Sequence, residues 1–272
     1  MFTKIVGNIF DYLEDNLLDI DKIKAIVKEM EKNGSISDLN SYNPSKVSIL
    51  HIAAILGDYQ IVQNWIQNGN SIAFQLKRNI TPLYLAVFFN QNEIIRILLK
   101  SGANPNETSD NFQSPFQMAV KSGNENAVKM MLQHNADLDS KINSEVSPLY
   151  LAIKYKHLEI AKLLMKHGIE VNSKDSVLKT PLHTAVLFQN HEVISVLIDY
   201  GADINASTKS YKNTPLHFAA KSCYTEAINI LIKSGSSLKK KNEYGRNALE
   251  SSLTSINNPK KSFMTFVFNL HI

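Results

Sequence analysis

The residues of this chain best suited to catalysis or metal binding are its eight histidines and its single cysteine, Cys223. Histidine can act as a general base or hold a metal ion, and a cysteine thiolate is a nucleophile. The histidines do not cluster by spacing, and the sequence contains no H-E-x-x-H, C-x-x-C or G-x-x-x-x-G-K-[ST] pattern. No histidine follows Cys223 in the same turn to activate its thiol. We therefore predict a chain that is not an enzyme, with no catalytic residue, no metal site and no cofactor.

A tetrapeptide recurs along the chain and accounts for three of the histidines. Its first residue is Ser, Thr or Asn, and the copies begin at Ser48, Thr81, Ser114, Ser147, Thr180, Thr214 and Asn247. These residues lie 33, 33, 33, 33, 34 and 33 positions apart, and seven copies in phase indicate a repeat protein. The fourth position holds His51, His183 and His217, and in other copies Tyr, Gln or Glu. That tolerance favours a structural hydrogen bond over a reactive role.

Each copy has the features of a short helix. Ser, Thr or Asn is a good N-cap, because its side-chain oxygen accepts a hydrogen bond from a free amide of the first turn. Pro follows in five copies, at the first helical position, where its missing N–H removes no helical hydrogen bond. Leu or Phe comes next, and small or β-branched residues follow three and four places later, the spacing of a buried helix face. We therefore predict a first helix with one face in the core of each repeat.

A second helix is expected in each repeat, from segments such as NEIIRILLKSG and HEVISVLIDYG. A Glu in its first turn suits the positive end of the helix dipole. A Gly at its end suits the left-handed position that follows many helices. These glycines are Gly69, Gly102, Gly168, Gly201 and Gly235. Asn135 takes this place in the third copy.

Two short antiparallel helices and a hairpin loop every 33 residues resemble the ankyrin repeat. The tetrapeptide T-P-L-H is intact at Thr180–His183 and Thr214–His217, and the tract G-A-D-x-N is intact at Gly201–Asn205. The resemblance covers about residues 48–272. It implies an all-α repeat solenoid, an ankyrin-like stack of helix-turn-helix units with hairpin loops. It also implies that the fourth side chain of the tetrapeptide bridges neighbouring loops.

The repeat pattern divides the chain into three parts. Residues 1–47 are expected to form a degenerate capping repeat, residues 48–246 six ankyrin-like repeats, and residues 247–272 a C-terminal capping repeat. The six repeats are expected to start near residues 48, 81, 114, 147, 180 and 214. The end repeats of a solenoid are usually atypical because they cap the stack.

At two positions near the end of the first helix, the residue type differs between repeats more than at positions that pack in the core. At about 100° per residue, Phe88 and Phe89 point away from the core face that holds Leu83. Positions without a packing role are where a solenoid can encode partner specificity, on its concave face. The predicted partner-binding residues are Leu56, Phe88, Phe89, Tyr155, Leu187 and Phe188, with Lys121, Lys154 and Lys221 beside them. The alternative is that Phe88, Phe89 or Phe188 packs sideways against the next repeat.

The distribution of charge leaves a second function open. From Lys209 to Ile272 there are ten Lys and Arg and three Glu, a net +7, whereas the remaining residues carry 19 basic and 22 acidic groups, a net −3. Basic segments can bind nucleic acid or anionic membranes. The candidate anion-binding residues are Lys239, Lys240 and Lys241. Such short runs are usually solvated loops, so nucleic acid is not the expected partner.

These observations favour a non-enzymatic scaffold that binds a partner protein on its concave face. A lone cysteine suggests a reducing compartment, and no stretch approaches the roughly 18 to 20 apolar residues that cross a bilayer. We therefore expect a cytoplasmic monomer without a transmembrane segment. Abundant Asn, Lys and Ile are typical of AT-rich genomes, and similar ankyrin proteins occur in intracellular bacteria, poxviruses and protists. The resemblance thus implies a host-directed effector or virulence factor, located in the host cytoplasm if it is secreted.

Overall fold

Short α-helices make up most of the described chain. The computed structural model describes residues 49–253, apart from 74, 76–78, 110–112, 143–145 and 178. Its contacts divide the chain into two compact units, residues 1–137 and 138–272. Between the helices, the described residues contain one isolated bridge, from Ile142 to Val146, and no strand. The expected cap at residues 1–47 and residues 254–272 of the C-terminal cap lie outside the described residues.

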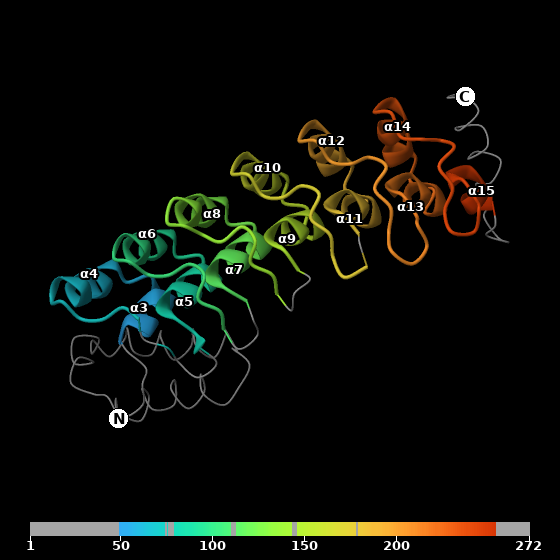
Figure 1. The fold of residues 1–272 in the computed structure, drawn as a ribbon. Coiled ribbons are helices and arrows are strands. Elements are labelled where there is room, and N and C mark those ends of the chain that lie inside the picture. Colours follow the sequence, from blue (N-terminus) through green and yellow to red (C-terminus); the bar gives the residue numbers. More distant parts are fainter. Residues whose placement is uncertain are drawn as a thin grey trace, which may run out of the picture. The chain divides into compact units, whose positions relative to one another are not determined.

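In the first unit, the described helices form consecutive pairs, each joined by a short turn. The pairs are α3 (Ile49–Leu56) with α4 (Tyr59–Gln67), α5 (Pro82–Phe88) with α6 (Asn92–Lys100), and α7 (Pro115–Ser122) with α8 (Glu125–Leu132). Helices α3, α5 and α7 pack side by side as one layer, and α4, α6 and α8 pack as a second layer (Figure 1).

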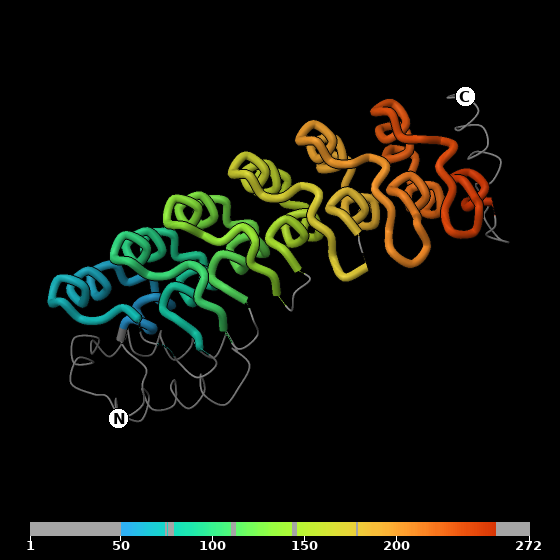
Figure 2. The backbone as a smooth tube through the Cα atoms, in the orientation of Figure 1, coloured from blue at the N-terminus to red at the C-terminus, as the bar shows by residue number. Residues whose placement is uncertain are grey.

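The second unit repeats this arrangement. Its pairs are α9 (Pro148–Lys154) with α10 (Leu158–Lys166), α11 (Pro181–Leu187) with α12 (His191–Asp199), and α13 (Pro215–Lys221) with α14 (Thr225–Lys233), followed by α15 (Ala248–Leu253). Helices α9, α11, α13 and α15 form one layer, and α10, α12 and α14 form the other. Figure 2 traces the long loops that lead from the second helix of one pair to the first helix of the next.

The predicted N-caps start the first helices. In α5, the Thr81 hydroxyl accepts a hydrogen bond from the Tyr84 N–H at 3.1 Å. In α7, the Gln117 N–H donates to the Ser114 hydroxyl at 3.2 Å, and the Ser114 N–H donates to the Gln117 side-chain oxygen at 3.1 Å. This reciprocal pair satisfies two amides that a helix start leaves without partners. Capping therefore confirms the predicted helix starts.

The predicted core faces are buried. In α5, Leu83, Ala86 and Val87 are exposed by 2%, 0% and 1%, and Leu98 of α6 is fully buried. Small side chains on the first helix let the second helix approach closely, and close packing is what stabilises such an interior. The same pattern of buried Leu, Ala and β-branched residues recurs in the second unit.

The second helices end at residues with left-handed backbone. Gly102 and Gly168 have φ of 92° and 88°, and Asn135 takes the same conformation with φ of 60°. Asn tolerates this region better than most residues, which explains how it replaces Gly here. The turn inside each helix pair also contains a residue with positive φ. Those residues are Gly57, Asn90, Gly123, Lys156, Gln189 and Cys223.

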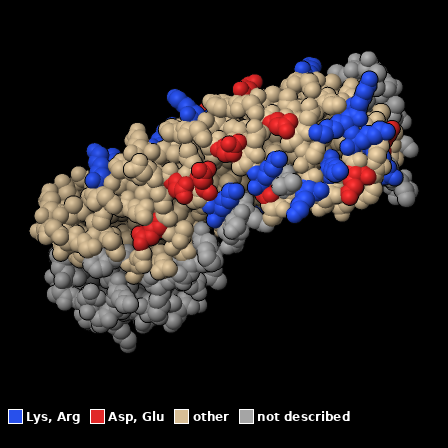
Figure 3. All heavy atoms as spheres, in the orientation of Figure 1, with Lys and Arg blue, Asp and Glu red and all other residues tan. Residues whose placement is uncertain are grey.

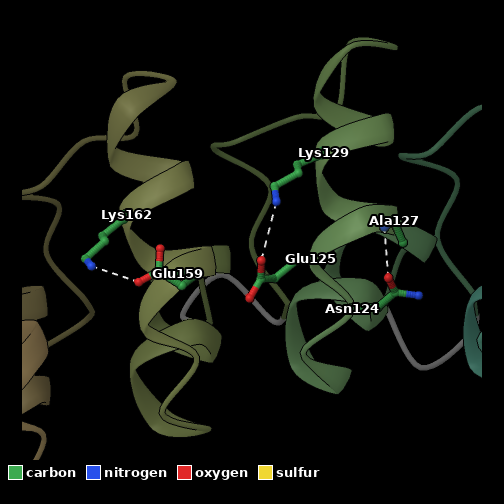
Figure 4. Close-up of polar contacts among 6 residues, drawn as sticks. All are labelled: Asn124, Glu125, Ala127, Lys129, Glu159 and Lys162. Atoms are coloured by element: carbon green, nitrogen blue, oxygen red, sulfur yellow. Dashed lines mark hydrogen bonds and ion pairs between the residues drawn. The ribbon is translucent and has the colours of Figure 1, made fainter.

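The second helices carry charged pairs on exposed faces. Glu125 and Lys129 of α8 lie 3.4 Å apart, and Glu159 and Lys162 of α10 lie 2.8 Å apart (Figure 4). The Asn124 side chain also caps α8 by accepting from the Ala127 N–H at 2.9 Å. Each Glu lies in the first helical turn, where its charge complements the helix dipole as predicted. Exposed pairs of this kind add little stability.

Candidate partner-binding surface

The repeat histidines connect neighbouring loops. The Thr180 N–H donates to Nδ1 of His183 at 3.2 Å, and Nε2 of His183 lies 3.1 Å from the Asn213 carbonyl oxygen. The Nε2 atoms of His51 and His217 lie 3.3 Å and 3.0 Å from equivalent carbonyl oxygens of the next loop. Because Nδ1 accepts from an N–H, the ring proton of His183 belongs on Nε2. Both nitrogens of His183 are therefore engaged within the protein.

Burial keeps the His183 ring neutral. Its side chain is fully buried, and loss of hydration lowers its pKa to about 4, against a smaller opposing effect of the hydrogen bond to Asn213. Burial lowers the pKa of His217 as well. In the described part of the chain, no group of three or more His, Cys, Asp or Glu could hold a metal ion. The geometry that recurs at His51, His183 and His217 thus joins neighbouring repeats of the scaffold.

In the first unit, the predicted aromatic pair lies at the end of α5. Phe88 is the last residue of this helix, and Phe89 follows it as the C-cap. The ring centroids lie 5.3 Å apart with an interplanar angle of 67°, an edge-to-face contact. Both rings are half-buried, as is Leu56 on α3, while Lys121 on α7 is exposed. Part of each ring surface therefore stays open to a partner.

In the second unit, the predicted residues gather around Tyr150. Phe188 meets the Tyr150 ring edge-to-face with a centroid separation of 6.0 Å. The Lys154 ammonium lies 6.0 Å from the Tyr150 ring centroid and 5.5 Å from that of Tyr155, within the range of cation–π attraction. Tyr155 and Leu187 are exposed by 39% and 47%. Tyr150, Leu187 and Phe188 lie together as an apolar cluster that solvent reaches.

A groove of about 540 Å³ lies against this cluster. We call it the α9/α11 groove, because the loops and first helices of these successive repeats line it. Its apolar lining includes Tyr150, Val177, Leu187 and Phe188. Its charged lining residues are Lys141, Lys174, Lys179 and Asp175. Grooves of this size can bury a peptide side chain or a small ligand.

A second groove of about 350 Å³ lies further along the same unit, and we call it the α13/α15 groove. The rings of Tyr211 and Tyr244 stack at its edge with centroids 5.9 Å apart, and they are exposed by 51% and 62%. The Arg246 guanidinium lies 5.8 Å from the Tyr244 ring centroid. Lys221, which the sequence predicted as a binding residue, lines this groove. Lys179 lines both grooves.

Three exposed loop residues were missed by the sequence-based prediction. Val177, Tyr211 and Tyr244 each lie three residues before the N-cap of their repeat. Main-chain hydrogen bonds of 3.0 Å join the neighbouring loops, from the Lys209 N–H to Val177 and from the Glu243 N–H to Tyr211. An apolar residue at the same loop position in three successive repeats was the signal that could have identified them.

The lysine run is partly engaged within the protein. The Lys240 ammonium donates to the carbonyl oxygen of Asn205 in the preceding repeat at 2.6 Å. Lys239 and Lys241 are exposed. Lys and Arg side chains gather on the visible face over the C-terminal helices (Figure 3). The basic surface is therefore broader than the run itself.

Comparison with known families agrees with this architecture. A family model described as ankyrin repeats in three copies matches residues 19–109, 101–175 and 176–242. The chain belongs to the ankyrin repeat family. Ankyrin repeats generally mediate protein–protein interaction, and the family is typically non-enzymatic. Among the described residues, no helix is long and apolar enough to span a membrane.

Solved structures show the same fold. The human ASB11 ankyrin repeat domain is 25% identical, has a TM-score of 0.68, and is matched over 81% of this chain and 98% of that domain. The ankyrin repeat domain of Bcl-3, a member of the IkappaB protein family, is 22% identical with a TM-score of 0.72, over 83% of this chain and 99% of that domain.

Two curated relatives come from Arabidopsis thaliana. Calmodulin-binding transcription activators 6 and 5 are 30% and 26% identical to this ankyrin chain over 104 and 103 residues. These matches cover 38% and 37% of this chain but only 12% and 11% of the relatives. The similarity is thus confined to a small part of each relative.

Proposed function

We propose that this ankyrin repeat chain is a non-enzymatic scaffold that binds a partner protein on the concave face, through the ends of its first helices. The observation that carries the proposal is the set of apolar side chains at those helix ends that are not fully buried in the core. Phe88 and Phe89 are half-buried in the first unit, and Leu187 is 47% exposed in the second. Large apolar side chains left open on a soluble protein commonly belong to an interface, and aromatic residues are frequent interface anchors.

The experiment that tests this function is an affinity pull-down from eukaryotic cell lysate, read by mass spectrometry at low and high salt. Wild type is compared with a Phe88→Ala/Phe89→Ala variant and with a Phe188→Ala variant, so that each unit is tested separately. The control is Tyr200→Ala, because Tyr200 is 44% exposed but follows the second helix α12. We expect a protein that wild type and the control retain at high salt and that at least one Phe variant loses.

The far-ultraviolet circular dichroism of each variant separates binding from folding. Unchanged helical signal with lost binding supports an interface role for the rings. A collapse of the helical signal in the Phe88→Ala/Phe89→Ala variant would instead place these rings in the packing between repeats. Retention of every partner by all variants would contradict the proposed surface.

The second candidate function is binding of nucleic acid or anionic membrane through the basic C-terminal repeats. The net charge of +7 from Lys209 to Ile272 favours it, from ten Lys and Arg and three Glu. Binding that depends on phosphate contacts weakens steeply with salt. A Lys239→Gln/Lys241→Gln variant should then lose retained nucleic acid or lipid, whereas the Phe variants should keep it. Lys240 is omitted because its ammonium holds the Asn205 carbonyl.

The host-directed effector role, the cytoplasmic location and the monomeric state remain predictions. Fluorescence imaging of the tagged chain in eukaryotic cells tests the location. Sedimentation equilibrium tests the monomer. Failure to retain any protein from the eukaryotic lysate would contradict the effector role.

A further inference from the structure

The two grooves of the second unit form a basic track. Lys141, Lys174 and Lys179 line the α9/α11 groove together with one carboxylate, Asp175. Lys179, Lys221 and Arg246 line the α13/α15 groove, whose described lining residues include no carboxylate. Because Lys179 lines both grooves, a ligand that fills both must pass this residue. Positive charge in a groove attracts an acidic ligand more strongly than the same charge on an open surface.

The Lys and Arg side chains that line the grooves do not take part in the ion pairs between described residues. The ion pairs that join described residues lie on α6, α8 and α10, and none involves a groove lysine. Asp175 acts mainly as a loop cap, because one of its oxygens accepts from the Val177 and Lys179 N–H groups at 3.0 Å and 2.8 Å. Two further carboxylates, Glu243 and Glu250, adjoin lining residues of the α13/α15 groove in sequence, and both are exposed. The two grooves are nevertheless lined by five Lys and Arg side chains, which are Lys141, Lys174, Lys179, Lys221 and Arg246. The balance of charge along the track is therefore positive.

Each groove also offers apolar surface beside its cations. Val177 and Leu187 give the α9/α11 groove aliphatic surface, and they are 39% and 47% exposed. Phe218 and the stacked rings of Tyr211 and Tyr244 give the α13/α15 groove aromatic surface. Aliphatic walls suit the side chains of a polypeptide better than the phosphates of a nucleic acid. Apolar anchors set among charges are typical of protein interfaces.

We propose that the two grooves together bind an extended, acidic segment of the partner protein. One apolar side chain of this segment enters each groove, and a carboxylate between them pairs with Lys179. The groove centres lie roughly two helix spacings apart, or roughly 16–20 Å. An extended chain advances about 3.3 Å per residue and every second side chain faces the same way, so the two anchors are about six residues apart. This inference rests on the proposed function and names the chemistry of the partner.

The test is selection of a phage-displayed library of random peptides on the full chain, followed by binding measurements on the enriched peptides. We expect peptides rich in Asp and Glu, with two apolar residues about six positions apart. Lys179→Gln and Tyr244→Ser should each weaken their binding about tenfold, the effect of losing one interface anchor. Lys166→Gln and Tyr200→Ser are matched controls, because both residues are exposed and neither lines a groove. The controls should bind as wild type does.

Several outcomes would overturn the inference. They are a selection without enrichment, enriched peptides that are neutral or basic, and binding that neither groove variant weakens. Polyuridine RNA, or vesicles of phosphatidylserine and phosphatidylcholine, could instead bind with the same dependence on Lys179 while acidic peptides do not. That result would reassign the track to nucleic acid or lipid. Protein binding itself is decided separately by the pull-down with the Phe variants, so failure of the proposed function can be distinguished from failure of this inference.

Discussion

The Nε2 atom of His183 lies 3.1 Å from the carbonyl oxygen of Asn213, in the loop that leads to the following repeat. The Nδ1 atom of the same ring accepts a hydrogen bond from the Thr180 N–H, at the start of its own helix. One buried side chain thus joins the cap of one repeat to the loop of the next. Only the neutral ring can make both bonds, because protonated Nδ1 has no lone pair to accept the Thr180 N–H.

We expect the free energy of unfolding to fall as the pH falls from about 6.5 toward 4. Burial lowers the pKa of folded His183 to about 4, whereas an unfolded histidine titrates near ~6.5. The stabilisation from neutral His183 is complete above the pKa of the unfolded histidine. It is lost as the pH falls, because the unfolded chain binds the proton more readily than the folded chain does. The full effect of this residue is about 3 kcal/mol below pH ~4. Urea denaturation at a series of pH values measures it.

Carboxylates also titrate in this range, so the measurement needs a matched variant. In α7 the position equivalent to His183 holds Gln117, whose side-chain oxygen accepts from the Ser114 N–H at 3.1 Å. His183→Gln can therefore keep the cap hydrogen bond while removing the titrating group. Its stability should depend on pH less steeply than that of wild type. Equal slopes for the two proteins would show that His183 does not carry this pH dependence.

The helix starts and the core could be predicted from the sequence because their causes are local. Thr81 caps the helix in which Leu83 is buried, and the proline between them starts it. The residue types and their spacing therefore predict the cap, the helix start and the buried face. Lys156 and Gln189 differ, because they take left-handed backbone in turns where Gly123 stands in another repeat. Lys and Gln have no preference for left-handed backbone, so only their place in the repeat predicts it.

The candidate binding surface was predicted only in part for a similar reason. Helix periodicity places Leu187 and Phe188 away from the core, and both line the α9/α11 groove. Val177, Tyr211 and Tyr244 come from the hairpin loops, which have no helical period. Main-chain hydrogen bonds between neighbouring loops bring them together, and such bonds leave no side-chain pattern in the sequence.

Replacing Lys156 by Gly should stabilise the protein by about 1 kcal/mol. Lys156 has φ of 60° and is exposed, in the turn between α9 and α10. A residue with a Cβ loses roughly 1–2 kcal/mol in this region, and the greater freedom of unfolded Gly offsets part of the gain. The midpoint of urea denaturation should therefore rise. The reverse control is Gly168→Ala, with φ of 88° and no heavy atom within 4 Å of the added Cβ. It should lower stability through the backbone alone, and a stabilised Gly168→Ala variant would refute this reasoning.

Asn172 should stabilise the second unit by joining two loops. Its side-chain N–H donates to the Gly201 carbonyl at 3.1 Å, and its side-chain oxygen accepts from the Asp203 N–H at 2.8 Å. Asn172→Ala removes both bonds, which we expect to cost about 1–2 kcal/mol. Hydrogen exchange at the Asp203 amide should accelerate, and the thermal midpoint should fall. Asn172→Asp keeps an acceptor for that amide but loses the donor, so its effect should be smaller. Unchanged exchange at Asp203 in the Ala variant would contradict the bridge.

Phe116 should be the most sensitive core position of the first unit. It is fully buried in α7, at the position where Leu83 stands in α5 and Leu149 in α9, and it is among the largest side chains with no exposed surface. Truncation to Ala leaves a cavity and should cost about 3–5 kcal/mol, whereas Phe116→Leu restores the residue of the other repeats and should cost less. Repeat proteins are stabilised mainly by contacts between neighbours, so hydrogen exchange should accelerate first in α5 to α8. Guanidinium denaturation measures the total loss, and equal losses for the Ala and Leu variants would mean that the cavity does not set the cost.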